Sequence, residues 1–206
     1  MTYGKDWLVA EDGQCQVCPT PREWDLLETP YRFHRFLTDI EDVLKQAQTA
    51  HQCDCLPALR RLVRKLVLNS YWLQTQRPEL LHNEETAILN LYDEIGYPLT
   101  VQVETLLPGA MSPVHNHGTW AIVAILQGQE QNTLWQRMPE PDWPQKITQV
   151  DEKVLAHGDV ISFTPEAIHG IQAVGEKSLA TFNLYGETER KQRFEFNPTT
   201  HQAKNY

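Results

Sequence analysis

The residues best able to do chemistry in this 206-residue chain are three histidines. His115 and His117 are separated by one residue and precede the apolar segment 121–126. Residues i and i+2 of a strand project to the same face, so both imidazoles can reach one cation. A third ligand must then come from another strand, and His169 is the best candidate. The pattern predicts a metal site at these three histidines, whereas an isolated His-x-His is more often a surface feature.

Glycines and prolines around these histidines are spaced as in the two cupin motifs, which the sequence resembles. The residues that carry the resemblance are Gly109, His115, His117 and Gly128, then Gly158, Pro165, His169 and Asn183. The first motif normally supplies a glutamate ligand shortly after its second histidine, but the matching positions here are Ala121 and Ile122. Three neutral imidazoles leave the charge of a divalent ion uncompensated. Such a site favours an anionic ligand brought by the substrate, for example a thiolate.

Two longer segments, 113–135 and 178–186, resemble the thiol dioxygenases, namely cysteine dioxygenase and mercaptopropionate dioxygenase. The resemblance implies one iron(II) ion per chain, with a small thiol and O2 as partners. In that family both oxygen atoms go to sulfur, and the product is a sulfinate. The chain is therefore predicted to be a non-heme iron thiol dioxygenase for a substrate of the cysteine or mercaptopropionate type. His115, His117 and His169 match the family's iron ligands.

The same resemblance assigns catalytic roles along one segment. Thr181, Asn183 and Tyr185 occupy the positions of the family's serine–histidine–tyrosine relay. Tyr185 matches the tyrosine whose hydroxyl faces the iron. Asn183 can orient that hydroxyl by hydrogen bonding, but it cannot change charge as histidine does.

The substrate-binding residues follow the family less closely. The arginine that holds the substrate carboxylate in cysteine dioxygenase falls near Leu89, which cannot bind a carboxylate. Arg193 lies near the place of the mercaptopropionate enzyme's arginine, and Arg190 is a neighbouring candidate; a surface position is the alternative for both. Trp120, like Trp135, is a candidate for the pocket wall, with the barrel core as the alternative.

Two periodicities define the elements that must position these residues. Helical spacing of apolar residues predicts helices at 31–50, 58–73 and about 79–93. After Pro98 the pattern alternates, with Thr100, Gln102 and Glu104 on one face. Strands are predicted at 99–105, 119–126, 132–136, 145–150, 159–163, 168–174 and 179–185. Helices first and strands second indicate an α+β fold, with the helices packed on an antiparallel cupin β-barrel.

We expect these elements to form one compact unit with three portions. Residues 1–95 form a helical N-terminal portion that begins with an irregular lead-in over residues 1–30. Residues 96–195 form the cupin barrel with the metal site. Residues 196–206 form a C-terminal tail.

Composition excludes some classes of function. The net charge is −9 and the pI about 5.3, so nucleic acid is not an expected partner. The basic residues Arg60, Arg61, Arg64 and Lys65 interleave with an apolar helix face and are interpreted as a solvated side. No apolar run is long enough to cross a bilayer and no secretory signal is present, so a cytoplasmic protein is expected. The sequence does not indicate an oligomeric state.

Alternatives remain open for the metal sites. The absent arginine and Asn183 also suit a cupin that holds a metal and binds a small ligand without turnover. Another kind of metal-dependent cupin enzyme has less support, because such enzymes usually keep the glutamate. A structural zinc site at Cys15, Cys18, Cys53 and Cys55 is conceivable, with free thiols as the alternative in a reducing cytosol.

Overall fold

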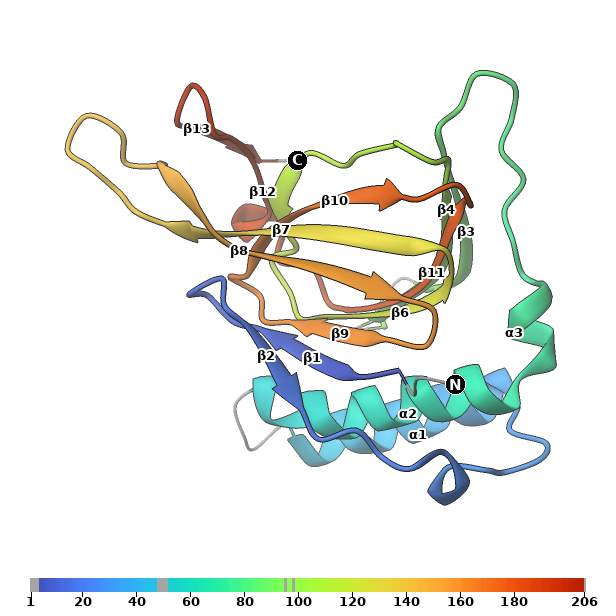
Figure 1. Cartoon of the computed structure of the whole chain (residues 1–206). Helices are drawn as coiled ribbons and strands as arrows, with labels where there is room; N and C mark the ends of the chain where they lie inside the picture. Colours follow the sequence, from blue (N-terminus) through green and yellow to red (C-terminus); the bar gives the residue numbers. More distant parts are fainter. Residues whose placement is uncertain (1–3, 48–51, 95, 98, 206) are drawn as a thin grey trace.

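Two β-sheets face each other, and helices cover the outside of one of them (Figure 1). The computed structural model describes residues 4–47, 52–94, 96–97 and 99–205, without the side chains of residues 52 and 53. The helices are α1 (Phe33–Ala47), α2 (Leu56–Asn69) and α3 (Tyr71–Thr75), with 3-10 turns at η1 (Glu23–Asp25), η2 (Gln52–Cys55) and η3 (Arg190–Gln192). No helix in these ranges is long and apolar enough to cross a membrane.

The sheets have the strand orders β2-β1-β9-β6-β11-β4-β3 and β13-β12-β5-β10-β7-β8. The strands are β1 (Asp6–Val9), β2 (Cys15–Cys18), β3 (Thr86–Asp93), β4 (Leu99–Leu106), β5 (Val114–Asn116), β6 (Ala121–Gln127), β7 (Gln129–Arg137), β8 (Ile147–Ala156), β9 (Val160–Phe163), β10 (Ile168–Val174), β11 (Leu179–Gly186), β12 (Phe194–Asn197) and β13 (Gln202–Asn205). Among these strands every pairing is antiparallel except that of β1 with β9. The arrangement is the double-stranded β-helix of cupins, and the predicted α+β fold is confirmed.

The surroundings of strand β6 explain why every residue from Ala121 to Leu126 is apolar. Ile122 and Ala124 face outward and pack with α1 and α2, in a core that includes Phe36 and Leu59. Val123 faces inward and packs in the core between the two sheets. Both faces of the strand are therefore buried, and a polar residue on either side would lack solvent.

The alternation of β4 and β11 places polar side chains inside the barrel. Val101 and Val103 of β4 face the helices, as does Phe182 of β11. The intervening residues, among them Gln102 of β4 and Asn183 of β11, line an internal cavity. Antiparallel sheets commonly have an apolar face on the core and a polar face in water. Here the helices cover the apolar outer face, so the polar face is left to form a site.

The prediction of a third helix over residues 79–93 is wrong, because Thr86–Asp93 forms β3 at the edge of the sheet beside β4. The pairing register shifts between Asn90 and Tyr92. A bulge of this kind adds a residue and interrupts the two-residue alternation of a strand. The apolar residues around the bulge then follow no strand period, which explains the mistaken helical interpretation.

The expected irregular lead-in and C-terminal tail are also wrong, because both ends of the chain contribute strands. β1 lies parallel to β9 and pairs with β2, so residues 6–18 extend the sheet beneath the barrel (Figure 1). β12 and β13 form a hairpin that pairs with β5. Arg137 of β7 lies over the rings of Phe194 and Phe196 and holds this hairpin against the barrel.

The first two predicted helices are confirmed, the first beginning at Phe33 and the second beginning earlier than predicted, at Leu56. The second ends at Asn69, and Ser70 begins α3 by accepting a hydrogen bond from the backbone N–H of Leu73 at 3.2 Å. The prediction that the basic residues of this helix are solvated is wrong for Arg60 and Arg64, which are only 4% and 5% exposed. Their guanidinium groups anchor α2 to the sheet through hydrogen bonds to Ser162 and Asp6.

Candidate metal centre

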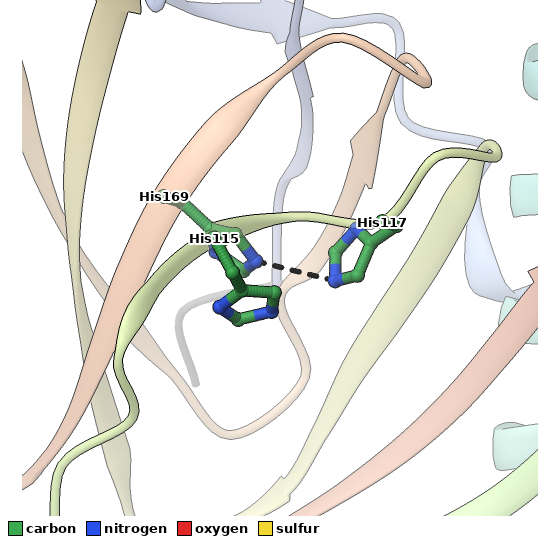
Figure 2. A group of neighbouring side chains, drawn as sticks. All are labelled: His115, His117 and His169. Atoms are coloured by element: carbon green, nitrogen blue, oxygen red, sulfur yellow. Dashed lines mark hydrogen bonds between the residues drawn. The ribbon is translucent and has the colours of Figure 1, made fainter. Parts of the chain in front are cut away.

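Three histidine side chains converge between the sheets (Figure 2). Strands β5 and β10 pair antiparallel with His115 directly opposite His169, and His117 follows the end of β5. One nitrogen from each ring lies within 4.8 Å of the other two, and Nε2 of His117 is 3.3 Å from Nε2 of His169. Two nitrogens that bind one ion at about 2.1 Å are separated by about 3–4 Å. The predicted convergence of these three histidines is therefore confirmed.

Hydrogen bonds fix which nitrogen of two rings faces the centre. Nδ1 of His115 is 2.9 Å from the carbonyl oxygen of Pro113, and Nδ1 of His169 is 2.9 Å from Oδ1 of Asn132. Both partners only accept, so both Nδ1 atoms carry the proton and both Nε2 atoms keep a lone pair. Nδ1 of His117 is buried and has no hydrogen-bond partner among the described residues. This donor set fits a divalent transition metal.

Burial keeps the three rings neutral. It lowers the pKa of His115, and it lowers the pKa values of His117 and His169 further. The nearby guanidinium of Arg193 adds to the effect on His115 and His117. Metal binding requires deprotonated imidazole. The site therefore presents metal ligands at neutral pH without first losing protons.

The histidines line a cavity of about 360 Å³, a size that suits a small ligand. Its polar wall comes from β4, β7 and β11, with the side chains Thr100, Gln102, Glu104, Glu130, Asn183 and Tyr185. Val123 and Ile171 contribute apolar wall, and Arg193 enters from the segment that precedes β12.

Two of the three predicted relay residues line this cavity. Tyr185 packs beside His117 with 5.2 Å between ring centroids, and Asn183 is its neighbour on the same face of β11. Thr181 is 1% exposed and lies outside the cavity wall, where its Oγ1 accepts a hydrogen bond of 3.0 Å from Nδ2 of Asn183. The described residues show no hydrogen bond between Asn183 and Tyr185, since Asn183 donates to Thr181 instead. The side chain of Gln102 lies close enough to the hydroxyl of Tyr185 to affect its pKa.

The hydroxyl of Tyr185 keeps its proton. Burial raises its pKa above the ordinary value, and the neighbouring carboxyl groups of Glu104 and Glu130 raise it further. A protonated phenol can donate a hydrogen bond to an anionic or oxygen-bearing ligand in the cavity.

The candidate substrate-binding residues are distributed differently from the prediction. Arg193 lines the cavity, whereas Arg190 is exposed on η3 and lies outside the cavity wall. Trp120 is 4% exposed and packs in the core beneath the helices, so the core alternative describes it correctly. Trp135 packs partly buried against the cluster formed by Ile147, Ile168 and Phe196.

Two residues beside the ligands hold the segment that carries Arg193. Asn116 lies between the ligands His115 and His117; its Nδ2 donates to the carbonyl oxygen of Gln192 at 2.8 Å, and its Oδ1 accepts from the N–H of Phe194 at 2.8 Å. Gly118 has φ +64°, and a Cβ there would lie 3.0 Å from the backbone nitrogen of Arg193. Glycine is required both for the conformation and for this close approach.

The sequence interpretation missed four polar residues at the site: Gln102, Glu104, Glu130 and Asn132. Alternation marks the first two as sharing a face of β4, and Glu130 and Asn132 share a face of β7 in the same way. The missing information was which face lies inside the barrel. Burial raises the pKa of Glu104 and that of Glu130 to about 7.

We expect Glu104→Gln to stabilise the metal-free protein in a pH-dependent way. The unfolded chain loses the Glu104 proton near pH 4.5, whereas the folded protein holds it to about pH 7. The free-energy cost of burying the ionised Glu104 carboxylate is therefore absent at low pH and fully present above pH 7. The free energy of unfolding should rise by about 3 kcal/mol at pH 8 and by less than about 1 kcal/mol at pH 5. Urea unfolding in the presence of a chelator measures both values, and an equal gain at the two pH values would exclude charge burial as the cause.

The cysteines do not form a metal site among the described side chains. Cys15 and Cys18 lie on β2, and Cys55 is buried at the start of α2. The side chain of Cys53 lies outside the described residues. Within the described part of the chain, the group of three or more potential ligands is the histidine triad.

Comparisons with known proteins add little to this description. No protein-family model matches the chain, and no curated protein matches its sequence. Similar solved structures include a cupin superfamily protein from Desulfitobacterium hafniense, with 15% identity over 52% of this chain and 82% of that chain and a TM-score of 0.40. The Cnp3 cupin domain of Schizosaccharomyces pombe has 14% identity over 57% and 73%, with a TM-score of 0.43. An oxalate oxidase in complex with the substrate analogue glycolate has 14% identity over 59% and 60%, with a TM-score of 0.41. The fold itself is defined by the strand order and register of the two sheets.

Proposed function

We propose that this protein is an iron(II)-dependent dioxygenase that oxidises a small organic thiol to its sulfinic acid. The reaction adds both atoms of O2 to sulfur, so RSH and O2 give RSO2H. The observation that carries the proposal is a group of three neutral imidazoles, with no carboxylate among them, in a small cavity beside a protonated tyrosine and an arginine. The resemblance of segments 113–135 and 178–186 to thiol dioxygenases supports it.

His115, His117 and His169 would hold the iron through their Nε2 atoms. Bound iron(II) supplies open coordination positions for a thiolate and for O2. Because the three ligands are neutral, a thiolate reduces the net charge of the site more effectively than a neutral donor would. The donor set therefore favours thiols over alcohols or amines.

Arg193 attracts and orients the substrate. Its guanidinium lies close enough to affect the pKa values of His115, His117 and Tyr185. A planar guanidinium binds carboxylate through paired hydrogen bonds. A thiol that carries a carboxylate, such as mercaptopropionate or cysteine, can place its sulfur at the histidines and its carboxylate at Arg193.

Tyr185 holds a proton at Oη in the wall of the cavity, beside the ligand His117. Gln102 lies close enough to the hydroxyl to affect its pKa, and the ring of His117 packs against that of Tyr185. The hydroxyl can stabilise negative charge that develops on oxygen during the transfer. The ring of Phe163 packs against those of His117 and His169, with 4.2 Å between its centroid and that of His169, and helps to exclude water.

Oxygen uptake by the iron-loaded protein tests the proposal. We expect cysteine, 3-mercaptopropionate or cysteamine to be consumed together with O2 in a one-to-one ratio, with the sulfinate identified by mass spectrometry. The matched control is Tyr185→Phe, which keeps the ring but removes the hydroxyl. It should retain iron and turn over at least about tenfold more slowly. Full iron content without sulfinate from any of the three thiols would contradict the proposal and favour a cupin that binds its ligand without turnover.

A further inference from the structure

A buried chain of hydrogen bonds connects one histidine of the triad to a carboxyl group. Nδ1 of His169 donates to Oδ1 of Asn132 at 2.9 Å, and Nδ2 of Asn132 donates to Oε1 of Glu130 at 2.7 Å. His169, Asn132 and Glu130 are 4%, 0% and 2% exposed. Asn132 and Glu130 are two residues apart on β7, which pairs with the strand that carries His169. The link is therefore held by the sheet.

The direction of each hydrogen bond is fixed by the chemistry of its ends. Oε1 of Glu130 accepts the hydrogen bond, so the amide nitrogen of Asn132 faces Glu130. The amide oxygen of Asn132 then faces His169, whose Nδ1 must donate. This leaves the lone pair of His169 on Nε2, toward His117. Through these two hydrogen bonds, Glu130 and Asn132 determine the tautomer of the metal ligand His169.

The position of Glu130 matters because the ligand set lacks a carboxylate. The two positions where the cupin motif offers glutamate hold Ala121 and Ile122, both fully buried. A divalent ion on three imidazoles in a buried site has uncompensated charge, which is costly. A carboxylate that polarises a ligand through hydrogen bonds makes that ligand a stronger donor.

We infer that Glu130 is the charge partner of the metal and acts through Asn132 on His169, in place of a directly bound glutamate. Glu130 and Asn132 are positioning residues, since the group that could hold the metal consists of the three histidines. Asn132 transmits the effect and sets the tautomer. Glu130 supplies the negative charge.

Glu104 provides a matched control in the same cavity. Burial also raises the pKa of the Glu104 carboxyl group to about 7. This carboxyl group makes no hydrogen bond or ion pair with any other residue in the described part of the chain. Glu104→Gln and Glu130→Gln each remove one negative charge from the cavity wall with little change in shape. Only the second removes it from the chain that ends at His169.

Cobalt(II) titration of the metal-free protein at pH 8 tests the inference, with calorimetry for affinity and the visible absorption bands of bound cobalt for the ligand field. Asn132→Ala should weaken binding by about 10–100-fold, and Glu130→Gln by about tenfold, with displaced bands in both. Glu104→Gln should weaken binding by about threefold at most and leave the bands in place. Equal effects of the two glutamine variants would overturn the inference in favour of general cavity charge.

A double-variant comparison separates transmission from mere packing. If Glu130 acts through Asn132, then Glu130→Gln adds little to the loss already caused by Asn132→Ala, whereas Glu104→Gln adds its full effect. Additive losses for Glu130→Gln and Asn132→Ala would contradict the inference. Unshifted cobalt bands in Glu130→Gln would also contradict it.

The inference uses the metal site of the proposed function but not its thiol chemistry. Tight cobalt binding by the wild type with no effect of Glu130→Gln would reject the inference and leave the oxygenase proposal standing. The expected cobalt results without oxidation of any thiol would reject the oxygenase proposal alone. Absence of cobalt binding by the wild type would reject the metal site on which both depend.

Discussion

His169→Ala is expected to be isolated without bound metal, and to bind cobalt(II) or iron(II) more than about a hundredfold more weakly than the wild type. The variant removes one of three nitrogens that lie within 4.8 Å of one another. Loss of a residue that only orients a ligand typically costs 10–100-fold in affinity, so loss of the ligand itself should cost more. Metal content by elemental analysis and affinity by calorimetry measure the effect.

His157→Ala is the matched control for this change. His157 is an exposed histidine in the turn between β8 and β9, outside the cavity wall. It should leave the metal content at the wild-type value. Circular dichroism should show that His169→Ala stays folded, because the cores on both faces of β6 are intact. A folded His169→Ala protein with full metal content would show that these histidines are not the metal ligands.

The metal site was predictable because its signal is local. The spacing of His115 and His117 predicts that both point to one side, although only His115 lies within β5. The motif glycines and Pro165 identify the returning strand that carries His169. The remaining wall of the cavity is not a local property. Gln102 and Glu130 are ordinary polar residues of alternating strands until the helices cover the opposite face. Which face is inside depends on contacts between distant segments.

The errors in the fold have similar causes. The strand β3 was missed because a bulge at Asn90 to Tyr92 breaks its alternation. The strand β1 is four residues long and joins the sheet through its pairing with β9, more than 150 positions away. Arg60 and Arg64 carry charge in the middle of a helix, and charge normally indicates solvent. Their burial depends on Ser162 and Asp6, which no pattern within the helix reveals.

Asp6→Ala is expected to reduce the free energy of unfolding by about 3–5 kcal/mol, a large effect for a residue outside the cavity. The side chains of Asp6 and Arg64 are 2% and 6% exposed, and Arg64 also donates to the carbonyl oxygen of Gly158 at 3.0 Å. Removal of the carboxylate leaves a guanidinium buried without its counter-charge between α2 and β1. For a chain of this length the midpoint of thermal unfolding should fall by about 10 °C.

The paired variant Asp6→Ala with Arg64→Met shows whether the unpaired charge is the cause. Methionine keeps much of the aliphatic stem and removes the charge, so the double variant should recover at least about 2 kcal/mol relative to Asp6→Ala. The exposed pair of Arg22 and Asp25 is the control, since Asp25→Ala should cost less than about 1 kcal/mol. Urea unfolding of the four proteins gives each value. If the double variant were less stable than Asp6→Ala, the guanidinium would stabilise the fold without its carboxylate, and the ion pair could not be what joins the helical layer to the sheet.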